Sequence, residues 1–149
     1  MQWAALIAWV ATAGGGFVML AIWLSRGGMR QSREAGNRIR PPLILGHFLL
    51  AATGLVLWIV YIATDSDALA WVALALLAIV AVLGFTMFAI WYQRRQRGPA
   101  AATGVTGSPG SSETPPEQHF PVPIVALHGL LAVTTVVLVF LTAIGVGES

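Results

Sequence analysis

Two histidines, His47 and His128, lie inside long apolar stretches of the chain. An ionisable side chain at such a position is unfavourable in a membrane and by default indicates a functional site. Imidazole can bind a metal ion or a haem iron, transfer a proton, or hydrogen-bond a neighbouring helix. Cysteine is absent from all 149 residues, which excludes thiolate ligands, cysteine nucleophiles and disulfides.

The two histidines share their sequence context. When they are aligned, residues 42–53 and 123–134 follow the common pattern P-x-x-x-x-H-x-L-L-A-x-T. This agreement indicates an internal repeat of helix pairs. Each histidine follows its proline by five residues, which is about 8 Å along a helix. Two parallel helices would therefore hold both rings at one depth.

Four apolar segments must position these residues. The composition is 57% hydrophobic and 9% charged, whereas soluble proteins are about 25% charged. This excludes a soluble enzyme with an aqueous cleft, a disordered tail and a nucleic-acid-binding domain. A membrane helix needs about 20 apolar residues. Four stretches without Asp, Glu, Lys or Arg are long enough: 3–24, 42–63, 69–92 and 121–146.

The arginines set the expected direction of these helices. There is no lysine, and the eight arginines all lie within residues 26–40 and 94–97, whereas the loop at 64–68 is without any. The positive-inside rule places both arginine-rich loops in the cytoplasm and both termini outside. Short loops favour antiparallel neighbours. We therefore predict an all-α integral membrane protein with four transmembrane helices in an up-down-up-down bundle.

The chain is expected to form one bundle domain in three parts. Residues 1–97 contain the first three helices with an arginine-rich cytoplasmic loop, and residues 121–149 contain the fourth helix. Residues 98–120 are rich in Gly, Ala, Ser, Thr and Pro, which bury too little apolar surface to offset the entropy of ordering. This composition predicts a flexible cytoplasmic linker, with docking of a partner as the alternative.

The histidine pattern predicts a site for one haem b between His47 and His128. Alternate helices of a four-helix bundle lie diagonally across its core, and two imidazoles from opposite sides complete six-coordinate iron. Positions i, i+4 and i+7 share one helix face, and small residues there leave room for a flat macrocycle. These residues are Ala51 and Gly54 in one span and Ala132 and Thr135 in the other.

Other side chains are expected to support the macrocycle. Met19 and Met87 lie near the depth of the histidines, and packing against the ring is favoured over ligation of the iron. Arg40 and Arg94 are candidate partners of the haem propionates because arginine pairs strongly with carboxylates, although each can also serve topology alone. His119 is expected to be solvated, with propionate contact or proton donation as the alternative.

Other chemistries fit these residues less well. Zinc needs three or four protein ligands, and no cysteine or acid accompanies the histidines. A proton or ion transporter usually carries a relay of Asp, Glu or His across the bilayer, whereas these polar groups occupy one level. A hydrolase is disfavoured because no serine or acid lies near either histidine.

With two histidines in four apolar spans, the chain resembles small four-helix membrane b-type cytochromes and the haem-bearing anchor subunits of respiratory dehydrogenases. The resemblance covers the four spans in outline. It implies one-electron transfer with a quinone or a partner subunit near the cytoplasmic face, more than stand-alone catalysis. Two-haem transmembrane cytochromes use four histidines at two depths, and without a second pair this chain is expected to hold one haem.

Two rival functions stay open. A cofactor-free accessory subunit would pack within a larger respiratory or transport complex, and its histidines would hydrogen-bond across helices. A quinone or lipid binder would use the histidines as hydrogen-bond donors. Arginine without lysine, together with abundant alanine, looks actinobacterial. We therefore expect a multi-pass protein of the plasma (inner) membrane of a bacterium.

Overall fold

The computed structural model describes residues 1–31, 39–97 and 116–146. Four long helices make up most of this part of the chain: α1 (Gln2–Ser25), α3 (Pro41–Thr64), α4 (Asp67–Arg97) and α5 (Val122–Ala143). Two short elements accompany them, α2 (Gly28–Gln31) and the 3-10 helix η2 (Pro116–His119). All four long helices are long and apolar enough to cross a membrane. The prediction of an all-α, four-span membrane protein is confirmed.

The helix boundaries follow local sequence signals. Pro42 and Pro123 each occupy the second position of a helix, where a missing N–H is tolerated and the fixed φ suits the first turn. α3 ends at Thr64, and the following Asp65 adopts a left-handed conformation with φ of 55°, one that aspartate tolerates better than most residues. α4 begins two residues later at Asp67. This short reversal makes α3 and α4 antiparallel neighbours.

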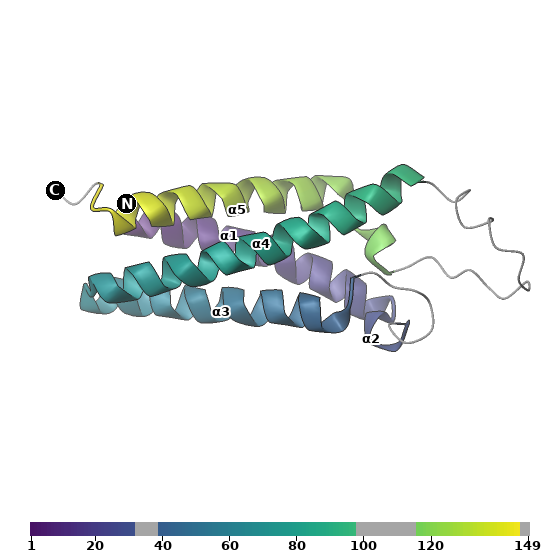
Figure 1. Ribbon diagram of the computed structural model, residues 1–149, viewed down its shortest axis with the longest axis horizontal. Coiled ribbons are helices and arrows are strands. Elements are labelled where there is room, and N and C mark those ends of the chain that lie inside the picture. The colour runs from purple at the N-terminus through teal and green to yellow at the C-terminus, as the bar shows by residue number, and fades with distance from the viewer. Residues whose placement is uncertain (32–38, 98–115, 147–149) are drawn as a thin grey trace, which may run out of the picture.

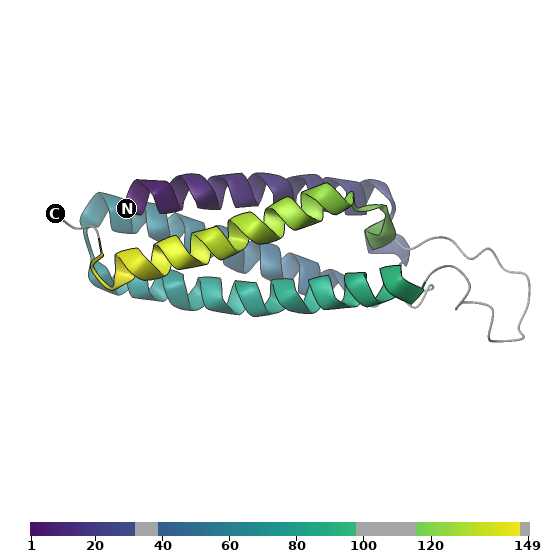
Figure 2. The same cartoon turned by 90° about the horizontal axis from the view of Figure 1, so that it is seen from above.

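The helices form an up-down-up-down bundle in which the start of α1 and the end of α5 lie at one end and α2 and η2 at the other (Figure 1). The closest packing joins α1 with α5 and α3 with α4, and sparser contacts join α4 with α5 and α1 with α3. Figures 1 and 2 together place α3 and α5 on opposite corners of the bundle. The two histidine-bearing helices are therefore diagonal, as the topology predicted.

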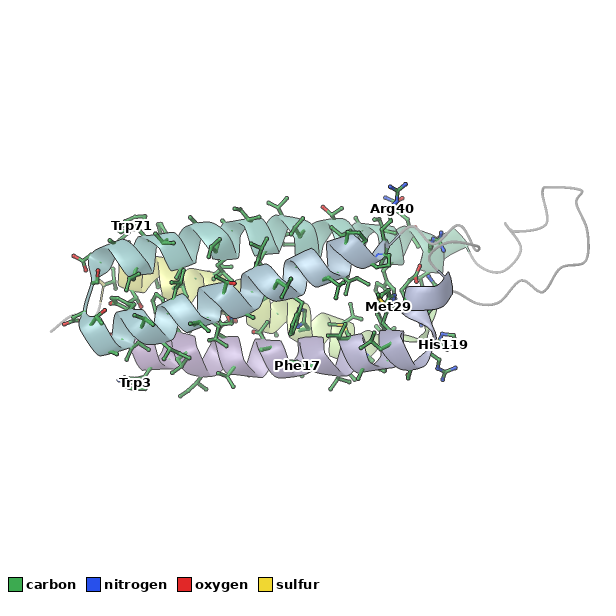
Figure 3. All side chains as sticks on the ribbon, turned by 90° about the horizontal axis from the view of Figure 1, so that it is seen from below. Trp3, Phe17, Met29, Arg40, Trp71 and His119 are labelled. Atoms are coloured by element: carbon green, nitrogen blue, oxygen red, sulfur yellow. The ribbon has the colours of Figure 1, made fainter. Side chains whose placement is uncertain are left out.

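The two ends of the bundle differ in composition. We call the end that carries α2 and η2 the arginine end, because the described arginines gather there: Arg26, Arg40, Arg94 and Arg95. Figure 3 shows Arg40 and His119 at this end, and Trp3 and Trp71 at the opposite one. Both of these tryptophans are exposed, as in the aromatic belts at membrane surfaces.

An aromatic core fills the half of the bundle opposite the arginine end. The Trp58 ring lies 6.4 Å from that of Trp9 and 4.8 Å from that of Tyr61. The indole Nε1 of Trp58 donates to the carbonyl oxygen of Gln2 at 3.3 Å. Small and aliphatic residues of α1, α4 and α5 complete this cluster: Ala5, Ala70, Ala73, Leu77 and Val139. His47 and His128 lie outside it, nearer the arginine end.

The bundle consists of two similar halves, α1 with α3 and α4 with α5. Besides the histidine motif of α3 and α5, residue types recur at one constant spacing between α1 and α4, at Trp3/Trp71, Ala5/Ala73, Gly16/Gly84, Met19/Met87, Trp23/Trp91 and Arg26/Arg94. In each half, the first helix packs on the second helix of the other half. Exchange of the halves thus preserves the contacts, which defines an approximate twofold axis along the bundle.

Candidate functional site

The structure brings His47 and His128 together between the two halves of the bundle. Their ring centroids are 6.4 Å apart and their planes are inclined by 56°. Both side chains are half-buried. Because one ring comes from α3 and the other from its equivalent α5, the pair straddles the approximate twofold axis.

Each ring is held by a backbone carbonyl of the other half. Nδ1 of His47 lies 3.1 Å from the oxygen of Val80 in α4, and Nδ1 of His128 lies 2.9 Å from the oxygen of Thr12 in α1. A carbonyl oxygen only accepts hydrogen bonds, so Nδ1 is the protonated nitrogen that donates. The other nitrogen, Nε2, then keeps its lone pair. Among the described residues, neither Nε2 has a hydrogen-bond partner.

Two equivalent glycines allow the rings to lie close to the neighbouring helices. A Cβ added at Gly84 would come within 3.2 Å of Cε1 of His47, and one added at Gly16 within 3.3 Å of Cε1 of His128. Both distances are shorter than ordinary side-chain contacts. Each imidazole therefore rests against a helix surface where a larger residue would displace it.

The residues predicted to flank the macrocycle divide into two groups. Ala51, Ala132, Met19 and Met87 are half-buried, and their contact with a macrocycle stays a prediction. The two i+7 positions, Gly54 and Thr135, already have partners within the bundle.

Trp9 and Thr12 of α1 are among those partners. A Cβ at Gly54 would lie 3.0 Å from the Trp9 ring, so this glycine makes room for the aromatic core. The buried Thr135 hydroxyl donates to the Leu131 carbonyl at 2.8 Å and lies 3.2 Å from the hydroxyl of Thr12. Both i+7 residues thus contact α1, and their contact with a macrocycle stays a prediction.

A buried carboxylate meets one of the arginines at the arginine end. Glu117 of η2 is fully buried, and its Oε1 lies 3.5 Å from a guanidinium nitrogen of Arg94. Burial raises the pKa of Glu117, while a backbone hydrogen bond and the charge of Arg94 oppose the rise. Arg94, a candidate propionate partner in the sequence, thus already lies beside a carboxylate of the chain itself.

Residues 116–119 lie near the end of the segment 98–120, which was predicted to be a linker. They form η2, which packs on α1 and α4, and residues 98–115 lie outside the described part of the chain. His119 was expected to be solvated, but its Nδ1 is buried and lacks a partner among the described residues. Arg40, the other candidate propionate partner, is exposed.

Two tryptophans near the arginine end carry buried indole N–H groups. Trp23 is fully buried and Trp91 is 5% exposed. Within the described residues, Nε1 of neither side chain has a hydrogen-bond acceptor. The two residues are equivalent in the repeat of α1 and α4. Arg95 lies over the Trp91 ring, with its guanidinium carbon 5.5 Å from the centroid.

Sequence reasoning missed the contacts that hold the histidines. Thr12 and Val80 contribute main-chain oxygens, which any residue type supplies. Gly16 and Gly84 could have been found, because they belong to the repeat between α1 and α4, which is visible in the sequence once the two helices are aligned.

Comparisons with known protein families, with curated proteins and with solved structures find no match for this chain. Fold and site therefore define its class: a four-span helical membrane protein with two pseudo-equivalent halves and a histidine pair between them. In the part of the chain that the structure describes, no group of three or more His, Cys, Asp or Glu side chains gathers. Among His, Cys, Asp and Glu of the described residues, the imidazoles of His47 and His128 are therefore the candidate metal ligands.

Proposed function

We propose that the protein binds one haem b between His47 and His128 and transfers single electrons. The supporting observation is the separation of the two rings. With a metal–imidazole bond of about 2 Å, two imidazoles on opposite sides of one iron have ring centroids about 6 Å apart. The observed separation of 6.4 Å is close to this value.

The hydrogen bonds of the rings also support ligation. Imidazoles that bind metals nearly always donate their other N–H to a carbonyl or carboxylate, which fixes the ring and raises the basicity of the ligating nitrogen. His47 and His128 both have this arrangement, through the carbonyls of Val80 and Thr12. Nε2 of each ring is left for the iron.

The packing of the helices indicates where the macrocycle would lie. α1 with α5 holds His128 and its carbonyl partner, and α3 with α4 holds His47 and its partner. The macrocycle would lie between these two closely packed pairs, where helix contacts are sparser. When bound, haem b supplies one-electron redox chemistry, and the protein tunes it through ligation, burial and hydrogen bonding.

Absorption spectroscopy of the full-length protein tests this function. Protein purified in detergent, from cells supplied with haem, should give the sharp reduced-minus-oxidised bands of a b-type cytochrome. His47→Ala and His128→Ala should each abolish these bands, whereas His119→Ala is the matched control and should keep them. A colourless, iron-free wild type, or full haem content in either axial variant, would refute the proposal.

A cofactor-free accessory subunit is the second candidate, because the histidine–carbonyl hydrogen bonds also join the two halves of the bundle. If the protein is such a subunit, the purified wild type should be colourless and free of iron. His47→Ala and His128→Ala should then lower stability only. The separation of the two rings favours haem, since a purely structural hydrogen bond to a carbonyl does not require the two histidines to lie near one another.

We place the arginine end in the cytoplasm of a bacterial cell, with a quinone or a partner subunit exchanging electrons there. The distribution of arginine supports this orientation. A reporter enzyme that is active only in the cytoplasm should be active when it is fused to the loop at residues 98–115. A reporter that is active only in the periplasm should be inactive there, and its activity would show that the orientation is the opposite one.

A further inference from the structure

The indoles of Trp23 and Trp91 are buried donors that the described residues leave without an acceptor. Such a group is unfavourable unless a ligand or water accepts its hydrogen bond. Trp58 is equally buried, but its N–H donates to the Gln2 carbonyl. Both carboxylate oxygens of Glu117 are also buried without a hydrogen-bond partner among the described residues, so neither of them accepts from these indoles. The two indoles therefore need an acceptor other than the described residues.

These indoles stand in the same relation to the two histidines. On α1, Gly16, Met19 and Trp23 share one face because they follow the i, i+3, i+7 spacing, and Gly16 lies against the ring of His128. Seven residues correspond to about 10 Å along a helix, here toward the arginine end. On α4 the same face, against the ring of His47, consists of Gly84, Met87 and Trp91.

The acceptor must therefore offer two hydrogen-bonding groups beyond the histidine pair, one for each half of the bundle. Haem b carries its two propionates on one edge of the macrocycle, one on each side of the midpoint of that edge. A haem held by His47 and His128 with this edge toward the arginine end would bring one carboxylate toward each indole. Hydrogen bonds to carboxylates are about twice as strong as those between neutral groups.

Resting on the proposed haem function, we infer that Trp23 and Trp91 each donate their indole N–H to one haem propionate. The chain's own charges agree with this assignment. Arg94 already lies 3.5 Å from Glu117, whereas the indoles have no carboxylate partner among the described residues. The positive charge of the arginine end favours the same orientation of the macrocycle.

Paired titrations test this inference. Full-length protein, produced under haem limitation and purified in detergent, is titrated with haem b and with haem b dimethyl ester, in which the propionate charges are removed. Trp23→Phe and Trp91→Phe should each weaken binding of haem b roughly tenfold, the loss of one charge-assisted hydrogen bond. Binding of the ester should change much less. Trp71→Phe, an exposed tryptophan at the opposite end, is the control and should change neither affinity.

The outcomes separate this inference from the function on which it rests. If wild-type protein binds neither porphyrin, the haem proposal itself fails. If haem b binds and requires both histidines, but both tryptophan variants keep the wild-type preference for haem b over its ester, only the propionate assignment fails.

A measurement on wild-type protein tests the same inference without depending on whether a variant folds. Ultraviolet resonance Raman spectra should show two indole N–H groups gaining a hydrogen bond when haem b is added. Unchanged indole bands in haem-loaded protein would overturn the assignment.

Discussion

Thr12 and Val80 occupy equivalent positions in the two halves of the bundle, and the backbone carbonyl of each accepts a hydrogen bond from the histidine of the other half. One is polar and the other aliphatic, so their common role depends on the main chain alone. The histidine pair is thus built from reciprocal contacts between the halves. Its geometry depends on how closely the helices approach one another.

Substitution by alanine should affect stability differently at a glycine beside a histidine ring and at a glycine without a close neighbour. A Cβ at Gly14 meets nothing within 4 Å, so Gly14→Ala should raise the free energy of unfolding by about 0.5–1 kcal/mol through helix propensity. Gly84→Ala should lack this gain, because Cε1 of His47 has to move. Thermal unfolding in detergent measures both variants. Equal stabilisation by both would contradict the close contact at Gly84.

Gly54→Ala should destabilise the bundle by about 1–3 kcal/mol, the usual effect of overpacking a filled core. The added methyl group would lie 3.0 Å from the Trp9 ring. Trp9→Phe in the same chain should recover part of this loss, and a double-mutant cycle of unfolding free energies measures the coupling. Additive effects would show that Gly54 and Trp9 do not share this space.

Glu117→Gln should stabilise the protein at neutral pH. Burial raises the pKa of this carboxyl above its usual value, so the folded state favours the protonated form. The stability that Glu117 contributes is therefore complete below the usual glutamate pKa and is lost as the pH rises through the raised value. Thermal midpoints for the two proteins should converge in acid and separate by a few degrees at neutral pH.

Arg94→Gln is the converse variant for the same site. It removes a positive charge that favours ionised Glu117, so the loss of stability with rising pH should become larger than in wild type. Glu117→Gln placed in this background should abolish the extra pH dependence. A pH profile unaffected by either substitution would contradict burial of an ionisable Glu117.

The two halves should assemble when they are made as separate chains. Residues 1–65 and 66–149 each contain one helix pair, and the closest packing, α1 with α5 and α3 with α4, joins one half to the other. Neither half can bury its helix faces alone. Co-expression with one tagged half should recover both from detergent extracts. Recovery of stable, monomeric single halves would contradict this account.

The membrane spans and their order could be predicted because hydropathy is a local property. The equal depth of His47 and His128 was also predictable, since each follows its proline at one spacing. The neighbours of Gly54 and Thr135 could not be predicted. A helical wheel gives the residues that share a face, but it does not give the rotation of that face toward one neighbouring helix. Here the i+7 positions meet α1.

The carboxylate at the arginine end escaped prediction for a related reason. Composition marked residues 98–120 as a linker, and nothing local distinguishes Pro116–His119 within it. Burial of Glu117 depends on packing of η2 against α1 and α4, which only the folded chain shows. Backbone acceptors such as the Val80 carbonyl are likewise invisible in a sequence.

The tight reversal at Asp65 has a consequence for how the histidine pair assembles. Two separate copies of a helix pair would have to collide in the membrane, and their association would follow the law of mass action. A covalent connection makes the same encounter intramolecular, at a high effective concentration. The two halves therefore bring their imidazoles together at any expression level, however dilute the protein is in its bilayer.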